Sequence, residues 1–321
     1  MRIEENTGQR TQADVSADSF RSRYERCTLC PRACGVNRNA GKTGFCRMDA
    51  RMFGARAALH MWEEPCISGE TGSGTVFFSG CTLGCIYCQN YEIARAQVGR
   101  EVTVPRLAEI FLELQEKKAV NVNLVTPTHY APSILEALKL ARKQGLVIPA
   151  VYNCSGYESV EALRMLDGWI DIYLTDFKYM EPELAARYSR AADYPERAKE
   201  ALAEMVRQTG EAVFEENGMM RRGTIVRHLL LPGHVRNAKE VVKYVFETYG
   251  NRVWISLMNQ YTPVEKAERL REAPELKRKV TKREYEALVD YAVEIGVENG
   301  FIQEGETAEE SFIPAFDFEG L

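Results

Sequence analysis

The chain has 321 residues, of which 45% are hydrophobic and 27% charged, a composition typical of a globular protein with one large domain and smaller attachments. Its formal net charge of −5 argues against nucleic-acid binding, and no apolar run approaches the roughly twenty residues that a membrane helix requires. The first residues also lack the apolar core of a secretory signal. Nine clustered cysteines indicate metal ligation in a reducing cytoplasm rather than disulfide bonds.

The first part of the chain divides into a polar arm and a cysteine-rich segment. Residues 1–22 show little periodicity and are predicted to be a mobile arm, whereas residues 23–69 contain a segment too small for an ordinary hydrophobic core. Four cysteines of this segment are expected to bind a metal: Cys27, Cys30, Cys34 and Cys46. A closed zinc site and an auxiliary [4Fe-4S] cluster use the same ligands, so both remain open. Cys66, at the end of the segment, is either a reactive thiol facing a cavity or a buried structural cysteine.

Three further cysteines, Cys81, Cys85 and Cys88, lie on one short stretch with the spacing C-x3-C-x2-C. Residues 75–78, directly before it, are β-branched and aromatic and are predicted to form a buried strand that ends at this loop. Three thiolates can bind three irons of a cubane cluster and leave the fourth open for substrate chemistry. The alternatives are three ordinary thiols or a zinc site with a distant fourth ligand.

From residue 70 onward, strand-like and helix-like segments alternate. The expected strands span residues 75–78, 121–125, 148–152, 170–174, 224–231 and 253–258, and helical periodicity recurs between them. This alternation predicts an α/β fold with parallel strands joined by right-handed crossovers. Six strands fall short of a complete (β/α)8 barrel, and a partial barrel and a doubly wound open sheet would give the same pattern. Residues 263–321 are predicted to be an extension whose aromatic end, residues 312–316, packs over the barrel.

The ends of the expected strands carry polar residues, and parallel α/β sheets bind their ligands at the carboxyl ends of the strands. Asp176 and Lys178 are two residues apart and should face the same way, where they would suit an ammonium and a carboxylate of one zwitterion. A mutually satisfied ion pair is the alternative. Asn153 and Ser155 supply short hydrogen-bonding groups at the end of another strand, although a plain turn would have the same residues.

The cysteine spacing, with an aromatic residue before the third cysteine, resembles the signature of the radical S-adenosylmethionine (radical SAM) superfamily. Residues 79–90 are similar to the branch around the pyruvate formate-lyase activating enzymes. The resemblance implies a partial (β/α)6 barrel over residues 70–262 and a [4Fe-4S] cluster whose open iron binds S-adenosylmethionine (SAM). One electron then cleaves SAM to methionine and a 5′-deoxyadenosyl radical, which abstracts hydrogen from the substrate.

The resemblance also implies roles for other residues. Asp176 and Lys178 match a D-x-K motif that contacts the methionyl end of SAM in the related activating enzymes, and Asn153 and Ser155 lie where these have T-N-G. Arg227 matches a strand arginine and is a candidate ligand for the carboxylate of SAM or for a substrate anion. Gln260, at the end of the last strand, is also expected to contact SAM. The next residue, Tyr261, stands where the pyruvate formate-lyase activator has a histidine, so the role of that histidine does not transfer.

The second strand departs from the family pattern. Many members carry a Gly-Gly-Glu run there, whose backbone receives the methionyl amino group, whereas this chain has Thr-Pro-Thr-His-Tyr. Thr126 and Thr128 are expected to supply hydroxyl and carbonyl groups to SAM instead. His129 is a candidate general acid/base or substrate ligand, with a turn-stabilising role as the alternative.

The leading hypothesis is a radical SAM enzyme that acts on a small molecule or peptide and receives electrons from a flavodoxin- or ferredoxin-type reductant. The second hypothesis has the same chemistry directed at a backbone glycine of a glycyl-radical enzyme. Activators of that kind with auxiliary clusters insert two cysteine groups after the radical loop, whereas this chain has one group before it. The third hypothesis, from another class, is a non-catalytic two-cluster electron carrier.

Overall fold

The computed structural model describes residues 22–263, 270–303 and 314–321. All but the last residue of the arm expected at 1–22 lie outside the described residues, as do Phe312 and Ile313 of the aromatic end. No helix in the described ranges is long and apolar enough to cross a membrane.

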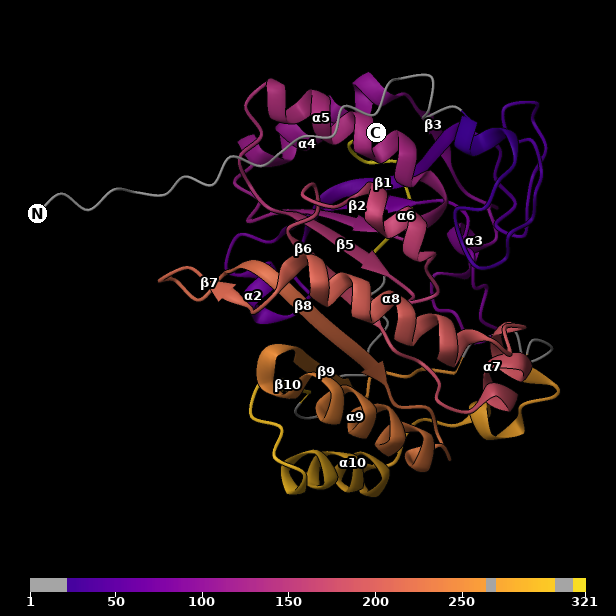
Figure 1. Cartoon of the computed structure of the whole chain (residues 1–321), viewed down its shortest axis with the longest axis vertical. Coiled ribbons are helices and arrows are strands. Elements are labelled where there is room, and N and C mark those ends of the chain that lie inside the picture. Colours follow the sequence, from indigo (N-terminus) through magenta and orange to yellow (C-terminus); the bar gives the residue numbers. More distant parts are fainter. Residues whose placement is uncertain (1–21, 264–269, 304–313) are drawn as a thin grey trace, which may run out of the picture.

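A mostly parallel sheet forms the centre of the molecule (Figure 1). Six strands are parallel to one another and lie side by side in the order in which they occur along the chain. They are β2 (Ser73–Phe78), β4 (Val122–Val125), β5 (Ala150–Cys154), β6 (Ile172–Asp176), β8 (Met220–Leu229) and β9 (Trp254–Met258). The prediction of an α/β partial barrel is therefore confirmed. Within the described residues the two edges of the sheet, β3 (Arg100–Val102) and β10 (Gly300–Ile302), do not pair, so the barrel is not closed.

Four strands were not predicted from the sequence. β1 (Met52–His60) pairs antiparallel with β2 and with β3, β7 (Val213–Phe214) forms a hairpin with β8, and β10 extends the sheet parallel to β9. β1 lies inside the expected cysteine-rich segment, so this segment adds an antiparallel strand to the sheet before the first parallel strand. Its sequence is rich in Ala and Gly, which give little strand signal. The backbone of residues 318–319 hydrogen-bonds to β1, and Arg56 pairs with Asp317 and Glu319.

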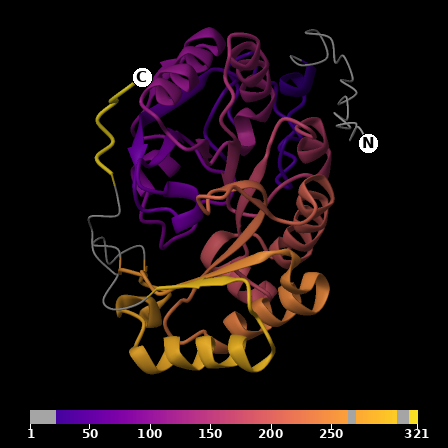
Figure 2. The same cartoon turned by 90° about the vertical axis from the view of Figure 1, so that its left-hand side faces the viewer.

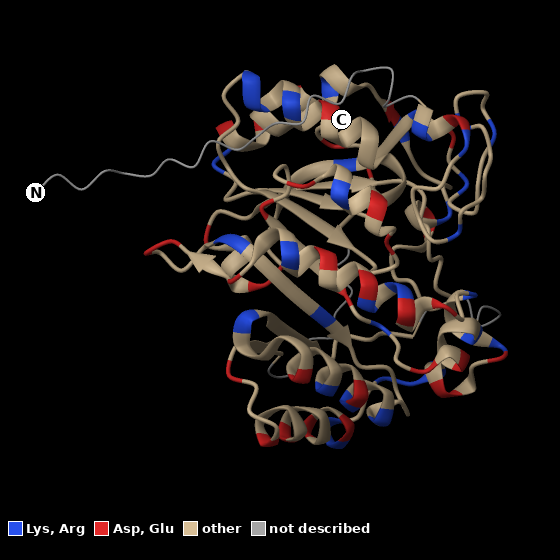
Figure 3. Ribbon diagram, in the orientation of Figure 1, with Lys and Arg blue, Asp and Glu red and all other residues tan. Residues whose placement is uncertain are grey.

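Helices cover the outer face of the sheet, and their buried faces form two large hydrophobic cores (Figure 2). The longer helices are α4 (Val104–Glu116), α5 (Ala131–Lys143), α8 (Tyr194–Thr209), α9 (Val235–Tyr249) and α10 (Lys282–Glu294). The shorter ones are α2 (Pro65–Ser68), α3 (Tyr91–Ala94), α6 (Val160–Met165) and α7 (Pro182–Ser189), with 3-10 turns at Thr128–Tyr130, Gly250–Arg252 and Pro274–Lys277. Charged residues gather on the helices, while the central strands carry few (Figure 3).

Different segments of the chain close the two ends of the barrel interior. The apolar part of α2, Cys66 and Ile67, packs against Val151, Ile172 and Ile225 near the beginnings of the strands. The cysteine loop after β2 is anchored at the other ends of the strands, where Leu83 is fully buried and the hydroxyl of Tyr87 lies 2.7 Å from that of Tyr179. Cys66 and Ile67, with the strand residues that they contact, close one end of the interior and are called the apolar base here. The cysteine loop lies at the other end.

Candidate active site

A cavity of about 530 Å³ lies between the cysteine loop and the inner faces of the strands. The cysteine loop begins after Gly80, whose φ is +90°. A Cβ atom at this position would lie 2.8 Å from the carbonyl oxygen of Cys46. Only glycine tolerates both this backbone conformation and this close approach. The cysteine loop and the N-terminal cysteine-rich segment are thus in direct contact.

The three cysteines of the loop, Cys81, Cys85 and Cys88, all line the cavity. The Sγ atom of Cys81 accepts hydrogen bonds from the amides of Leu83 and Gly84, at 3.4 Å each. Burial raises the pKa of Cys81, and it raises the pKa of Cys88 to about 12, while Lys178 acts in the opposite direction on both thiols. Metal binding requires thiolates, and amide donors together with a neighbouring ammonium favour that form. The donor set therefore fits an iron–sulfur cluster.

Asp176 and Lys178, at the end of β6, also line the cavity and form an ion pair with each other. Burial alone would lower the pKa of Lys178, but the negative charges of Asp176 and Cys85 outweigh burial and raise it. Lys178 is therefore a permanent cation beside the cysteine loop. Both readings of the D-x-K motif apply to the structure, because the pair is mutually satisfied and also faces the cavity.

Four more of the expected cofactor-binding residues line this cavity: Thr126, Asn153, Ser155 and Gln260. Thr126 has a φ of +59°, which is unusual for a β-branched residue and turns the chain sharply after β4. The Oε1 atom of Gln260 accepts a hydrogen bond of 3.0 Å from Gln303. Together with the Asp176–Lys178 pair, these residues bring the ends of four strands, β4, β5, β6 and β9, to one cavity.

Thr128 and His129 do not line the cavity. The Thr128 hydroxyl donates to the buried carboxyl of Glu158 at 2.8 Å, so it is not directed at a cofactor. His129 is 2% exposed, its Nε2 atom lies 2.8 Å from the carbonyl oxygen of Ser79, and burial lowers its pKa to about 3. A histidine that stays neutral and is packed away from the cavity does not serve as a general acid/base, so its turn-stabilising role is the one that the structure supports.

Cys66 is likewise absent from the cavity wall. It is 6% exposed within the apolar base under the barrel, and burial raises its pKa to about 12. Of the two alternatives for Cys66, the structure supports the buried structural cysteine and not the reactive thiol, because a deeply buried thiol remains protonated and unreactive.

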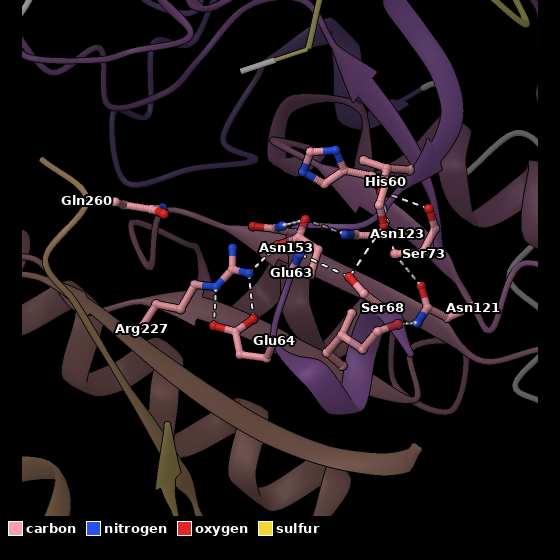
Figure 4. Close-up of polar contacts among 12 residues, drawn as sticks. His60, Glu63, Glu64, Ser68, Ser73, Asn121, Asn123, Asn153, Arg227 and Gln260 are labelled. Atoms are coloured by element: carbon pink, nitrogen blue, oxygen red, sulfur yellow. Dashed lines mark hydrogen bonds and ion pairs between the residues drawn. The ribbon is translucent and has the colours of Figure 1, made fainter. Parts of the chain in front are cut away.

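Arg227 lines the cavity, but its guanidinium group is already engaged. It forms ion pairs with Glu63 and Glu64, whose side chains are 7% and 5% exposed (Figure 4). Burial would lower the pKa of Arg227, but the two carboxylates outweigh it and hold the pKa well above its usual range. The expectation that Arg227 binds a carboxylate or a substrate anion is not supported, because its charge is more than compensated. The sequence analysis missed both glutamates, although two adjacent acids before Pro65 at a short helix were a usable signal.

The segment with the four N-terminal cysteines contacts the cysteine loop at Gly80, beside the carbonyl oxygen of Cys46. Cys27 and Cys46 are buried, Cys30 is half-buried and Cys34 is exposed, and all four are free thiols. Neighbouring charges on Cys27 and Cys46 raise the pKa of Cys30, after the larger effect of burial. In the described part of the chain, no group of three or more His, Cys, Asp or Glu side chains is arranged to hold a single metal ion. A second metal centre is therefore a proposal.

Two arginines hold this segment against the barrel. Arg32 donates to the carbonyl oxygens of Thr82 and Leu83, at 3.0 and 3.3 Å, within the cysteine loop. Arg38 is 1% exposed and donates to the backbone of Asp49 and to the carbonyl oxygen of His129. The N-terminal segment is thus attached to the cysteine loop and to the end of the second parallel strand.

Comparison with known proteins agrees with this geometry. The family model described as the radical SAM superfamily matches residues 75–245, from β2 into α9. The uncharacterized protein MJ0674 of Methanocaldococcus jannaschii is 30% identical over 291 residues, which cover 87% of this chain and 78% of that protein.

Among solved structures, the fold is similar to that of SuiB from Streptococcus suis. The structure bound to S-adenosylmethionine has 14% identity and a TM-score of 0.48, and covers 71% of this chain and 49% of SuiB. The structure bound to the precursor peptide SuiA has 12% identity and a TM-score of 0.48, and covers 71% of this chain and 47% of SuiB. This chain therefore spans about half the length of SuiB.

The family match covers the cysteine loop, the Asp176–Lys178 pair and Arg227, and extends over more than half of the chain. The chain belongs to the radical SAM superfamily, whose members are enzymes that bind a [4Fe-4S] cluster and S-adenosylmethionine.

Proposed function

We propose that this enzyme binds its cluster through Cys81, Cys85 and Cys88 and abstracts hydrogen from a small-molecule or peptide substrate. The observation that carries the proposal is that these three cysteines and the Asp176–Lys178 pair line the same cavity. When bound, the cluster supplies the electron that cleaves SAM reductively, which yields the radical that abstracts hydrogen. Formation of 5′-deoxyadenosine by the reduced, iron-loaded chain tests this proposal.

Asp176 and Lys178 are proposed to orient the methionyl group of SAM. Its ammonium would pair with Asp176 and its carboxylate with Lys178, so each residue would exchange its present partner for an equally charged one. Thr126, Asn153, Ser155 and Gln260 are proposed to supply further polar contacts to SAM, since all four line the cavity. Fixed donors and acceptors of this kind position a ligand without reorganisation.

The size of the cavity supports a small substrate or a single side chain of a peptide. About 530 Å³ is typical of a site for one small-molecule ligand, and SAM would occupy much of this volume.

The similarity of residues 79–90 to the pyruvate formate-lyase activating enzymes supports a second candidate, an activase for a glycyl-radical enzyme. For either function we propose a cytoplasmic enzyme with a flavodoxin- or ferredoxin-type reductant. An electron carrier would not need a cavity of this kind beside its cluster, which disfavours the third hypothesis.

Replacement of Lys178 with Ala is expected to weaken SAM binding roughly tenfold or more, because a charge-assisted hydrogen bond contributes about 1.5–3 kcal/mol. Equilibrium binding of SAM to the anaerobic, iron-loaded variant measures the effect. Lys117, an exposed residue at the end of α4, provides the matched control, and Lys117→Ala should bind SAM as the wild type does. Equal affinity for SAM in the two variants would assign the Asp176–Lys178 pair a purely structural role.

We further propose that the N-terminal segment is an attachment stabilised by its own metal centre at Cys27, Cys30, Cys34 and Cys46. A segment this short buries little apolar area, so metal binding would supply its folding free energy. Metal analysis of the anaerobic protein is expected to give either about eight irons per chain, or about four irons and one zinc.

In Cys30→Ala this second metal should be lost while the cysteine loop keeps its four irons. Four irons, no zinc and four freely alkylated N-terminal thiols in the wild type would show that these cysteines bind no metal.

A further inference from the structure

We propose that the floor of the cavity binds a protonated primary amine of the substrate through Glu63. The floor is defined here by four cavity-lining residues, Glu63, Glu64, Asn153 and Arg227. Asn123 donates a hydrogen bond to Glu63 but does not itself line the cavity. The inference rests on the proposed function, since it assigns the floor to the molecule on which the radical acts. It names the chemistry of the substrate, which the cysteine loop and the SAM-binding residues leave open.

The floor lies across the cavity from the cysteine loop. Glu63 and Glu64 directly precede α2, whose Cys66 and Ile67 close the beginnings of the strands. Both glutamates line the cavity, and Figure 4 shows their carboxylates directed at Arg227. A group bound there would be in the same cavity as the three cysteines.

Arg227 and Glu64 form an ion pair in which their two charges balance each other. The Nε atom of Arg227 donates to Oε1 of Glu64 at 2.8 Å and its Nη2 atom donates to Oε2 at 2.5 Å, a two-point arrangement that matches the shape of both groups. Although burial acts in the opposite direction, Arg227, helped by a hydrogen bond from Ser256, lowers the pKa of the Glu64 carboxyl. One carboxylate is thus sufficient to neutralise Arg227.

Glu63 is the second carboxylate, and the single positive charge of Arg227 cannot balance both glutamates. Its Oε2 atom accepts a hydrogen bond from the same Nη2 atom of Arg227. Its Oε1 atom accepts hydrogen bonds from the side-chain amides of Asn123 at 2.8 Å and Asn153 at 3.2 Å. Amide groups orient a carboxylate but do not cancel its charge. The floor therefore carries a net charge of about −1 while Glu63 is 7% exposed, and a buried excess charge is costly unless a cation joins it.

A buried acceptor without a partner in the described part of the chain lies beside Glu63, on the side away from the cavity lining. The Oδ1 atom of Asn123 is buried and accepts no hydrogen bond from any described residue, although the nitrogen of the same amide contacts Glu63. A carboxylate with excess charge and an unpartnered acceptor therefore lie next to each other. An ammonium group has one positive charge and three donors and no acceptor, which matches the cavity-lining Glu63, whereas a carboxylate substrate would be repelled.

The other charged groups near the floor do not supply the missing cation. Lys178 is paired with Asp176, and Arg56 is paired with Asp317 and Glu319. Burial lowers the pKa of His60, which also lines the cavity, although the charge of Glu63 acts in the opposite direction. None of these side chains therefore balances Glu63, and a cation from outside the chain fits it. Because SAM itself carries a net positive charge, the probes below are titrated with SAM already bound.

The test compares three probes of equal length on the anaerobic, iron-loaded full chain: n-butylammonium, n-butanol and n-butyrate. Isothermal titration calorimetry is expected to show saturable binding of n-butylammonium, at least tenfold tighter than that of n-butanol, and no binding of n-butyrate. A short peptide with one internal lysine provides a second arm, because an amine is also the end of a lysine side chain. Tighter binding of this peptide than of n-butylammonium would indicate a peptide substrate, and the reverse order a small amine.

Glu63→Gln removes the excess charge and keeps the shape of the side chain, and it should weaken binding of n-butylammonium roughly tenfold or more. The Arg227–Glu64 pair stays balanced in this variant. Glu113→Gln, which changes a partly exposed residue on the outer side of α4, is the matched control and should leave binding unchanged. Equal binding of the amine and the alcohol by the wild type overturns the proposal whether or not Glu63→Gln folds, as does unchanged amine affinity in a folded Glu63→Gln.

This result is separable from the proposed function. If the chain cleaves SAM but does not discriminate among the three probes, the amine site is wrong and the radical chemistry stands. If the chain discriminates in favour of the amine but yields no 5′-deoxyadenosine, the floor binds an amine and the proposed reaction is wrong.

Discussion

Replacement of Cys81, Cys85 or Cys88 with Ala is expected to abolish formation of 5′-deoxyadenosine from SAM. Each cysteine would hold one iron of the cluster, and the loss of one thiolate leaves a corner without a protein ligand. The fold should largely survive, because the loop is held by the side chains of Leu83 and Tyr87 and by Arg32 rather than by its thiols. The measurement is 5′-deoxyadenosine formation in single-turnover reactions of the reduced protein, together with circular dichroism.

Cys66→Ala is the matched cysteine control for this experiment. Cys66 lies in the apolar base and not in the cavity wall, so its variant should keep both four irons at the cysteine loop and SAM cleavage. Wild-type turnover by the triple variant of Cys81, Cys85 and Cys88 would disprove the cluster assignment. A complete loss of SAM cleavage in a folded, iron-loaded Cys66→Ala would instead restore a catalytic role for this thiol.

Replacement of Arg227 with Ala is expected to lower the free energy of unfolding by about 3–5 kcal/mol, because it leaves two buried carboxylates without a cation. Denaturant unfolding monitored by circular dichroism measures this change. Arg106→Ala provides the control, since the Arg106–Glu113 pair is partly exposed and its loss should cost at most about 1 kcal/mol. A similar, small effect in both variants would mean that Glu63 and Glu64 are not buried against Arg227 in solution.

The central sheet was predictable because each of its strands is a short apolar run followed by an amphipathic helix. This periodicity predicted six parallel strands but left a partial barrel and a doubly wound sheet open. The resemblance to the radical SAM superfamily implied the barrel, whose strands follow chain order as in the structure. It did not predict β1, where alanine and glycine take the place of β-branched residues and where pairing with β2 decides the conformation. Strand formation there depends on a neighbour and not on local preference.

The roles of single side chains were less predictable, since they depend on distant partners. Asp176 and Lys178 lie in the cavity as the spacing of two residues on a strand predicts. Arg227 also lies there, but its partner Glu64 is 163 residues away along the chain, and no local pattern indicates that its charge is already compensated. His129 is similar, because its burial beside Ser79 depends on the packing of the N-terminal segment through Arg38.

The most direct test of the account is SAM cleavage by the wild-type chain, reconstituted with iron and sulfide under anaerobic conditions and reduced with dithionite. The account predicts 5′-deoxyadenosine and methionine in equal amounts, formed only when the protein is both iron-loaded and reduced. A protein with a full complement of iron at Cys81, Cys85 and Cys88 that binds SAM, yet forms no 5′-deoxyadenosine on reduction, would contradict it.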